Sequence, residues 1–181
     1  AQPRHPEAPE RVECIQEALA QCRWLQGFTH LPALELPRRL LESIHRPAYL
    51  NLLEMACTRG SGSLDSDTYF TAESWKLALQ AAGGALAVAQ AVWDGGARRG
   101  FALTRPPGHH ARPGQGMGFC LLNNIALAAE GLLHSGARRL AIVDLDLHHG
   151  NGTQEIFWQR ADVFYLSTHQ QPLYPYSGSL E

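Results

Sequence analysis

Residues 140–152 read Leu-Ala-Ile-Val-Asp-Leu-Asp-Leu-His-His-Gly-Asn-Gly, and this stretch decides the fold. Its first four residues form an apolar run typical of a buried strand, and carboxylates and imidazoles follow at the strand end. If the strand continues as far as His148, a side-chain period of two places Asp144, Asp146 and His148 on one side of the chain, where they converge on one point. Two neighbouring carboxylates at a buried strand end repel each other and lose hydration, so the pattern predicts a bound cation. The alternative is a cluster of helix caps and ion pairs.

Zinc is the cation that a mixed set of Asp and His side chains suits best. A catalytic zinc commonly has three protein ligands and one open position for water. Asp146 and His148 are therefore candidates for two of three zinc ligands.

A second polar motif, Arg-Pro-Pro-Gly-His-His-Ala at residues 105–111, follows the apolar run 101–104. The sheet topology is expected to bring its adjacent histidines, His109 and His110, beside the first cluster. There they are candidates for an acid/base pair acting on a metal-bound water, with Asp144 and Asn151 orienting them. A purely structural role for the two histidines is the alternative.

A glycine-rich stretch, residues 114–124, leads into a helix but has neither the GxGxxG nor the GxxxxGKS spacing of a phosphate-binding loop. Taken alone, it predicts a turn and a core helix, with Phe119 as a core aromatic residue.

The rest of the chain alternates between helical and strand patterns. This alternation predicts an α/β fold in which a mainly parallel sheet is covered by helices on both faces, with the ligand site at the carboxyl ends of the strands. Strands are expected at 101–104, 140–144 and 163–167, and a loop at 60–67. A first helix is expected to begin at Pro9, with Val12, Ile15 and Leu19 as its packing face. Two short helices are expected on either side of a break near residues 45–47. A long helix is expected from a cap at Thr71 or Ser74 to Gly95, and a last one over 123–134.

Composition limits the classes of function. The 181 residues carry a formal net charge of -2 without a run of basic residues, which gives no reason to expect direct nucleic-acid binding. No apolar run approaches a membrane span, and the start lacks a signal-peptide pattern. The scattered Cys14, Cys22, Cys57 and Cys120 predict reduced thiols in a cytoplasmic protein. The start at Ala1 and the end after a loop-like run suggest a fragment.

Four motifs together resemble one family: RPPGHHA, GFCLLNN and VDLDLHHGNGTQ, preceded by HPEAPER at residues 5–11. The chain is similar to the zinc-dependent histone deacetylase and acetylpolyamine amidohydrolase superfamily, and its HHGNG form is similar to the class II and bacterial branch. The resemblance implies a three-layer α/β/α fold of the arginase/deacetylase type, incomplete at the C-terminus. It also implies that residues 1–181 are the N-terminal part of a single catalytic domain.

The resemblance implies a role for each motif residue. Asp146 and His148 would bind Zn2+, and His109 and His110 would flank the water on the metal. His110 is similar to the general base and His109 to an electrostatic partner backed by Asp144, while Asn151 stands where many members have Asp behind His110. The residues of a narrow substrate tunnel would be Gly118, Phe119 and Tyr174, with Asp67 at its rim.

Further implied ligands belong to structural potassium. One K+ site would use Asp144, Asp146, His148, Ser167 and the Thr168 carbonyl, and a second would use the carbonyls of Phe157, Arg160 and Val163. The family's third zinc ligand, an aspartate, and its oxyanion-stabilising tyrosine would lie downstream of Glu181. The resemblance therefore implies that the 181 residues alone lack a complete active site.

The implied reaction is hydrolysis of an acetylated lysine side chain, an acetylated polyamine or another acylated amine, and the sequence does not decide among these substrates or fix the oligomeric state. One alternative is a non-catalytic module that binds acyl-lysine or a partner protein in a degenerate pocket. A two-manganese ureohydrolase is disfavoured because its extra carboxylate ligands are not evident and Asn151 is neutral.

Overall fold

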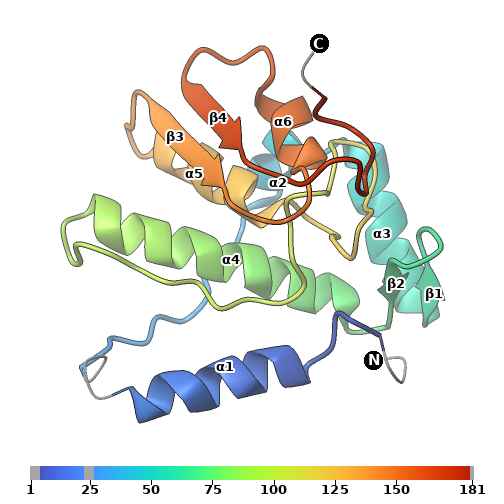
Figure 1. The fold of residues 1–181 in the computed structure, drawn as a ribbon, viewed down its shortest axis with the longest axis horizontal. Coiled ribbons are helices and arrows are strands. Elements are labelled where there is room, and N and C mark those ends of the chain that lie inside the picture. Colours follow the sequence, from blue (N-terminus) through green and yellow to red (C-terminus); the bar gives the residue numbers. More distant parts are fainter. Residues whose placement is uncertain (1–4, 23–26, 180–181) are drawn as a thin grey trace.

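The computed structural model describes residues 5–22 and 27–179 (Figure 1). Helices and strands alternate, as the sequence predicts, only in its last four elements, from residue 124 to residue 167. The helices are α1 (Glu10–Gln21), α2 (Arg38–Ile44), α3 (Pro47–Arg59), α4 (Ser74–Trp93), α5 (Asn124–His134) and α6 (Asn151–Phe157). The strands are β1 (Gly62–Ser63), β2 (Tyr69–Phe70), β3 (Leu140–Asp144) and β4 (Val163–Ser167).

Helix boundaries follow the proline and glycine signals. The break predicted near residues 45–47 is confirmed, because α2 ends at Ile44 and α3 begins at Pro47. Proline has no N–H, but the first residue of a helix needs none, because its N–H would have no partner within the helix. The end of α4 is also confirmed: Gly95 has φ +76° and its N–H donates to the Val92 carbonyl. The predicted cap of α4 is wrong, since the N-cap is Glu73 and the Ser74 hydroxyl instead accepts from the Thr71 N–H.

The core lies between α2, α3, α4 and α5. Helices α4 and α5 pack closely because Gly131 leaves room for Leu86: a Cβ on Gly131 would lie 2.4 Å from Leu86 Cδ1. The largest fully buried apolar side chains come from α3, α5 and the loop before α5, and they are Leu50, Leu53, Leu122 and Leu127. Burying such side chains contributes roughly 1.5–3 kcal/mol each.

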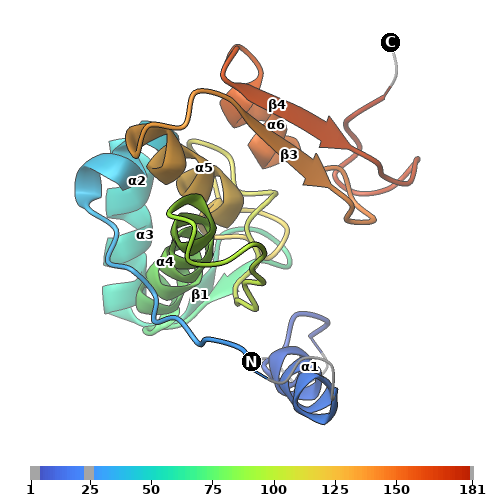
Figure 2. The same cartoon turned by 90° about the vertical axis from the view of Figure 1, so that its left-hand side faces the viewer.

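Strands β3 and β4 pair in parallel, with Leu140 opposite Val163 and Asp144 opposite Ser167. Their inward side carries core residues such as Ile142, whereas Phe164 on the other side is 64% exposed. Figure 2 shows this pair at one edge of the molecule, with α2, α3, α4 and α5 grouped together away from it. The described residues therefore cover one face of the pair, and the three-layer arrangement stays a prediction.

The strand predicted at residues 101–104 is wrong. This segment has no ladder partner among the described residues, and Phe101 is 66% exposed. It lies along α4 instead: a Cβ on Gly84 would lie 3.3 Å from Thr104 Cγ2, and one on Gly100 would overlap Val88. Contact with the helix replaces pairing in the sheet.

Two further expectations are corrected. Helix α1 forms from Glu10, but none of its residues is buried, and Figure 2 shows it apart from the helical group, so the predicted packing face is wrong. The predicted loop at 60–67 contains β1, which pairs antiparallel with β2 because Gly62 leaves room for the ring of Phe70. No helix among the described residues is long and apolar enough to cross a membrane.

Candidate functional site

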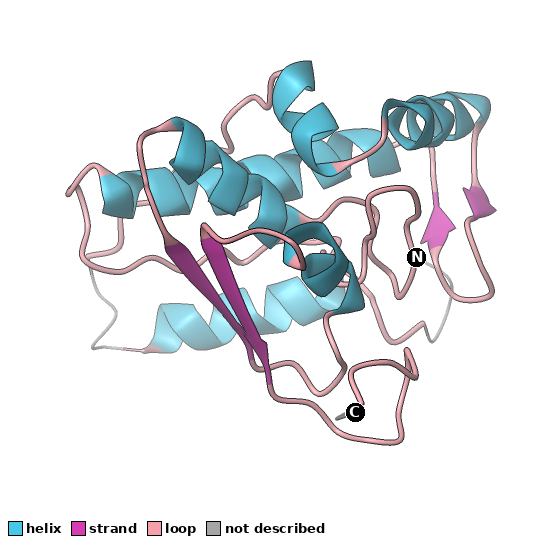
Figure 3. Ribbon diagram, turned by 90° about the horizontal axis from the view of Figure 1, so that it is seen from above, coloured by secondary structure: helices cyan, strands magenta, loops and turns pink. Residues whose placement is uncertain are grey.

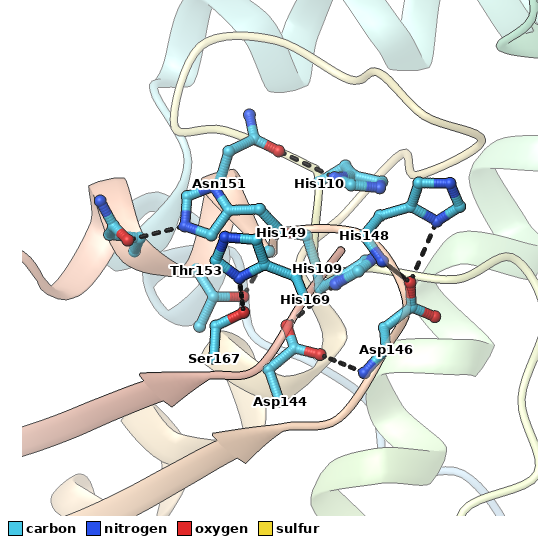
Figure 4. Close-up of polar contacts among 12 residues, drawn as sticks. His109, His110, Asp144, Asp146, His148, His149, Asn151, Thr153, Ser167 and His169 are labelled. Atoms are coloured by element: carbon cyan, nitrogen blue, oxygen red, sulfur yellow. Dashed lines mark hydrogen bonds and ion pairs between the residues drawn. The ribbon is translucent and has the colours of Figure 1, made fainter. Parts of the chain in front are cut away.

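The polar motifs meet at the carboxyl ends of β3 and β4, as predicted. The loop containing residues 105–111 approaches this edge, and α6 begins there directly after the Asp/His stretch, as Figures 3 and 4 show. A Cβ on Gly152, in the first turn of α6, would lie 2.3 Å from the Ala111 carbonyl oxygen. The glycine thus lets the helix rest on the backbone that carries the two histidines.

His109 is held by Asp144. Its Nδ1 lies 2.9 Å from Asp144 Oδ2, and the Tyr165 hydroxyl donates to the same oxygen at 3.0 Å. Burial alone would raise the pKa of Asp144, but hydrogen bonds from His109, the Asp146 N–H and Tyr165 bring it below its usual value. Asp144 therefore stays ionised and fixes the orientation of the His109 ring through Nδ1.

His110 is buried and its Nδ1 lies 2.8 Å from Asn151 Oδ1 (Figure 4). Burial, and then the neighbouring His109, lowers the pKa of His110 to about 4. An amide oxygen can only accept, so the neutral imidazole carries its proton on Nδ1 and keeps Nε2 as a free acceptor. This is the tautomer that a general base needs.

Asp146 and His148 lie beside this pair. His148 Nδ1 is 3.1 Å from Asp146 Oδ1, and His109 Nε2 is 3.8 Å from the same oxygen. Zinc bonds of about 2.0–2.1 Å at a tetrahedral angle place two donor atoms about 3.3 Å apart, so this oxygen and nitrogen fit adjacent zinc positions. Within residues 5–22 and 27–179, no group of three His, Cys, Asp or Glu side chains is arranged to hold a metal, so the fit covers two ligands.

The predicted tunnel residues also lie near the histidines. Gly118 has φ +56°, and a Cβ there would lie 2.4 Å from His110 Cδ2. The Tyr174 ring packs edge-on against His110, with ring centroids 5.1 Å apart, and its buried hydroxyl has no hydrogen-bond partner in the described part of the chain. Phe119 follows Gly118 directly, and Asp67 is exposed close to it.

The chain was compared with known families and proteins. The family model described as "Histone deacetylase domain" matches residues 5–181. The chain belongs to the histone deacetylase domain family. It is 43% identical to a "Probable deacetylase" of Archaeoglobus fulgidus, over 97% of this chain and 49% of that protein. It is 38% identical to a "Histone deacetylase-like amidohydrolase" of Pseudomonas aeruginosa, over 97% of this chain and 47% of that protein.

A solved structure supports the same membership in the histone deacetylase domain family. The "Crystal Structure of HDA15 HD domain" superposes with a TM-score of 0.92 at 38% identity, covering 97% of this chain and 52% of that one. "Histone deacetylase 15" of Arabidopsis thaliana matches all of this chain at 39% identity and is covered over 33% of its length. The chain thus spans about half or less of these relatives.

The cation ligands implied by family resemblance occupy connected positions. Ser167 pairs with Asp144 across β3 and β4, and the Thr168 N–H donates to the Asp144 carbonyl at 3.1 Å. At the other end of β4, the Arg160 N–H donates to the Phe157 carbonyl in the turn after α6, and Val163 begins the strand. The assignment of K+ to either set stays a prediction.

A buried network behind the histidines was missed by the sequence reasoning. His45 Nδ1 lies 3.0 Å from the Arg112 carbonyl, and its Nε2 accepts from the Asn123 N–H. The Asn123 amide donates to the Ala111 carbonyl and to the Thr153 hydroxyl, both at 3.1 Å. Asn123 is the first of the two asparagines that close the GFCLLNN run before a helix and could have been identified as an N-cap, whereas no signal marks His45.

Proposed function

We propose that the protein carrying this chain is a zinc-dependent amidohydrolase that removes acetyl groups from lysine side chains or acetylated polyamines. The observation that carries the proposal is the pairing of His109 with Asp144 and of His110 with Asn151 beside the two candidate zinc ligands. Asp144 is charged and Asn151 is neutral, so the two histidines have different environments. This difference favours an electrostatic role for His109 and a basic role for His110. The names of its relatives agree with the reaction class.

The two histidines divide the proton chemistry. His110 offers Nε2 as the acceptor for a proton from water and can return that proton to the leaving amine. His109, which Asp144 orients through Nδ1, is the electrostatic partner that favours the negative charge developing on the acyl oxygen. Asn151 fixes the ring of His110 without adding charge.

Zinc and potassium are part of the proposal. Asp146 and His148 would hold zinc, which when bound supplies Lewis acidity toward the acyl oxygen and toward water. The 181 residues alone are proposed to retain zinc poorly and to be inactive, because the described residues give two ligands where a catalytic site commonly has three. We also propose a structural K+ at the end of β3 and a cytoplasmic location.

The test uses the natural full-length protein. Zinc content is measured by elemental analysis, and hydrolysis is followed with a fluorogenic acetyl-lysine peptide and with acetylated polyamines. About one zinc per chain and release of acetate are expected for the wild type. His148→Ala is expected to lose the metal, and His110→Ala is expected to keep the metal but lose activity by at least about 100-fold.

A matched control is His30→Ala, which changes an exposed histidine and is expected to keep both zinc and activity. A wild-type protein that binds no zinc and hydrolyses none of the substrates would refute the proposal. Peptide binding without hydrolysis would instead favour a binding module.

A further inference from the structure

Phe119, which follows the glycine that contacts His110, lies in an unusual turn. Met117 and Cys120 exchange two backbone hydrogen bonds of 3.0 Å, and φ is +56° at Gly118 and +68° at Phe119 between them. Positive φ at both central residues is the type I′ pattern, in which glycine, Asn or Asp is strongly favoured at these positions. A bulky residue there is a backbone outlier, so another part of the structure must hold Phe119 in place.

Thr68 holds the backbone of Phe119 in this conformation. Its side chain is fully buried, and its hydroxyl accepts from the Phe119 N–H at 3.1 Å. The same hydroxyl lies 3.4 Å from Asp67 Oδ1 and can donate to it. Thr68 thus connects the backbone of Phe119 to the exposed carboxylate next to it.

The position of Thr68 is itself fixed locally. Its N–H donates to Asp65 Oδ1, and its carbonyl accepts from the Leu64 N–H at 2.8 Å. Thr68 directly precedes β2, so its backbone is also anchored by the pairing with β1. A small polar side chain on a fixed backbone is a rigid support.

The ring of Phe119 has contacts on one side and free space on another. The ring of His5 packs edge-on against it, with centroids 4.9 Å apart, and His5 Nε2 lies 3.0 Å from the Asp67 carbonyl. Phe119 also lines a cavity of about 150 Å³ together with Tyr69 and Leu121. If the turn is released, the ring therefore has somewhere to move.

We propose that Thr68 is a positioning residue that sets the acyl-chain selectivity of the site by fixing Phe119 in the turn whose neighbouring residue, Gly118, contacts His110. This inference rests on the proposed function. The Gly118–Phe119 turn touches His110 on one side and the small cavity on the other. Holding Phe119 in the left-handed conformation keeps its ring against the acyl chain and keeps the space behind the ring closed to longer chains. Without the Thr68 hydroxyl, the buried Phe119 N–H loses its partner and the turn can relax.

The test compares Thr68→Val, which has nearly the same shape but no hydroxyl, with Thr68→Ser, which keeps the hydroxyl, in the full-length protein. Thr58→Val on the exposed surface of α3 is the matched control. The butyryl-lysine to acetyl-lysine ratio of kcat/KM is expected to rise about fivefold or more in Thr68→Val. It is expected to stay at the wild-type value in the other two variants. Hydrogen exchange of the Phe119 amide should accelerate only in Thr68→Val.

Dissociation constants for both peptides, measured by titration calorimetry, separate the possible failures. The positioning role would be overturned if Thr68→Val lost thermal stability or amide protection while the butyryl-lysine to acetyl-lysine ratios of kcat/KM and of dissociation constants stayed unchanged. The proposed reaction would still stand. A wild-type protein that binds both peptides but hydrolyses neither would refute the reaction, while the ratio of dissociation constants still decides the role of Thr68. A wild-type protein that neither binds nor hydrolyses the peptides refutes both.

Discussion

The Tyr165 hydroxyl donates a hydrogen bond to Asp144 Oδ2, the same oxygen that lies 2.9 Å from His109 Nδ1. It also lies 3.1 Å from the Gly150 carbonyl, so one phenol joins β4 to the start of α6. The hydroxyl hydrogen can bond to one acceptor at a time, and the carboxylate is the stronger acceptor of the two because it is ionised. Tyr165 therefore fixes the carboxylate that orients His109.

Tyr165→Phe is expected to lower kcat/KM of the full-length protein about tenfold, since one hydrogen bond to a charged group is lost. Tyr176→Phe, which changes a tyrosine that is 83% exposed, should leave the rate unchanged. Steady-state kinetics on an acetyl-lysine peptide measure both variants. Equal rates for Tyr165→Phe and wild type would show that His109 needs no support from β4.

Gly118→Ala is expected to abolish most of the activity. The added methyl would lie 2.4 Å from His110 Cδ2 and 3.0 Å from the Tyr174 hydroxyl, so the imidazole must move from its bond with Asn151. Gly95→Ala is the matched control, because Gly95 also has positive φ but no atom lies within 4 Å of its Cβ position. Both variants should lose roughly 1 kcal/mol of stability through the left-handed backbone.

Denaturant unfolding and peptide hydrolysis distinguish the two glycines. Only the change at Gly118 should lower kcat, by on the order of 100-fold. Similar activities in the two variants would mean that the His110 ring tolerates displacement.

Stability is expected to fall in mild acid because of His45. Burial lowers the pKa of His45 to about 4, while the unfolded chain keeps the ordinary value of 6.5. Below pH 6.5 the unfolded state binds the extra proton, so the stabilisation is fully present above that pH and is lost progressively as the pH falls from 6.5 to about 4. The loss amounts to on the order of 2 kcal/mol at pH 5.

His45→Gln removes this titration while keeping an acceptor for the Asn123 N–H. Free energies of unfolding from urea titrations at pH 5 and pH 7 should differ less in this variant than in the wild type. An unchanged difference between the two pH values would assign the acid sensitivity to other groups.

Asn123→Asp should destabilise the protein by at least about 3 kcal/mol. The new carboxylate could still cap α5 through the Ala126 N–H, but it would face the Ala111 carbonyl and place an unpaired charge in a fully buried position. Asn51→Asp, at an exposed position where Arg38 donates to the side chain, should be neutral within about 0.5 kcal/mol. Thermal unfolding of both variants gives the comparison, and similar midpoints would contradict the importance of the donor bonds.

Much of the site could be predicted because its chemistry is local in sequence. The strand at 140–144 and the polar residues after it form one continuous stretch, so Asp144 and Asp146 lie together as predicted. The strand does not continue to His148, however: it ends at Asp144, and the Asp146 N–H donates to Asp144 Oδ1 in the bend that follows. The approach of His109 required only that a second polar motif reach the same edge. It was expected for the wrong reason, because the segment before it packs on α4 and does not join the sheet.

The supporting residues could not be predicted because they act over long separations. His45 contacts the backbone at Arg112, 67 positions away, and nothing near His45 distinguishes it from a surface histidine. Thr68 was likewise hidden, since its partner is the N–H of Phe119, and backbone groups leave no mark on sequence. Side chains that bind backbone atoms are therefore the part of a site that motif reasoning misses.

The pairing of Asp144 with Ser167 determines where the gene can gain or lose codons. One codon inserted within β3, between residues 140 and 144, would turn the strand residues that follow it to the opposite face and remove Asp144 from its place beside His109. A codon added at 158–162, in the connection before β4, can be absorbed without moving any of these side chains. We expect natural length variation in this lineage to collect in that connection and to be absent from the strand before the histidines.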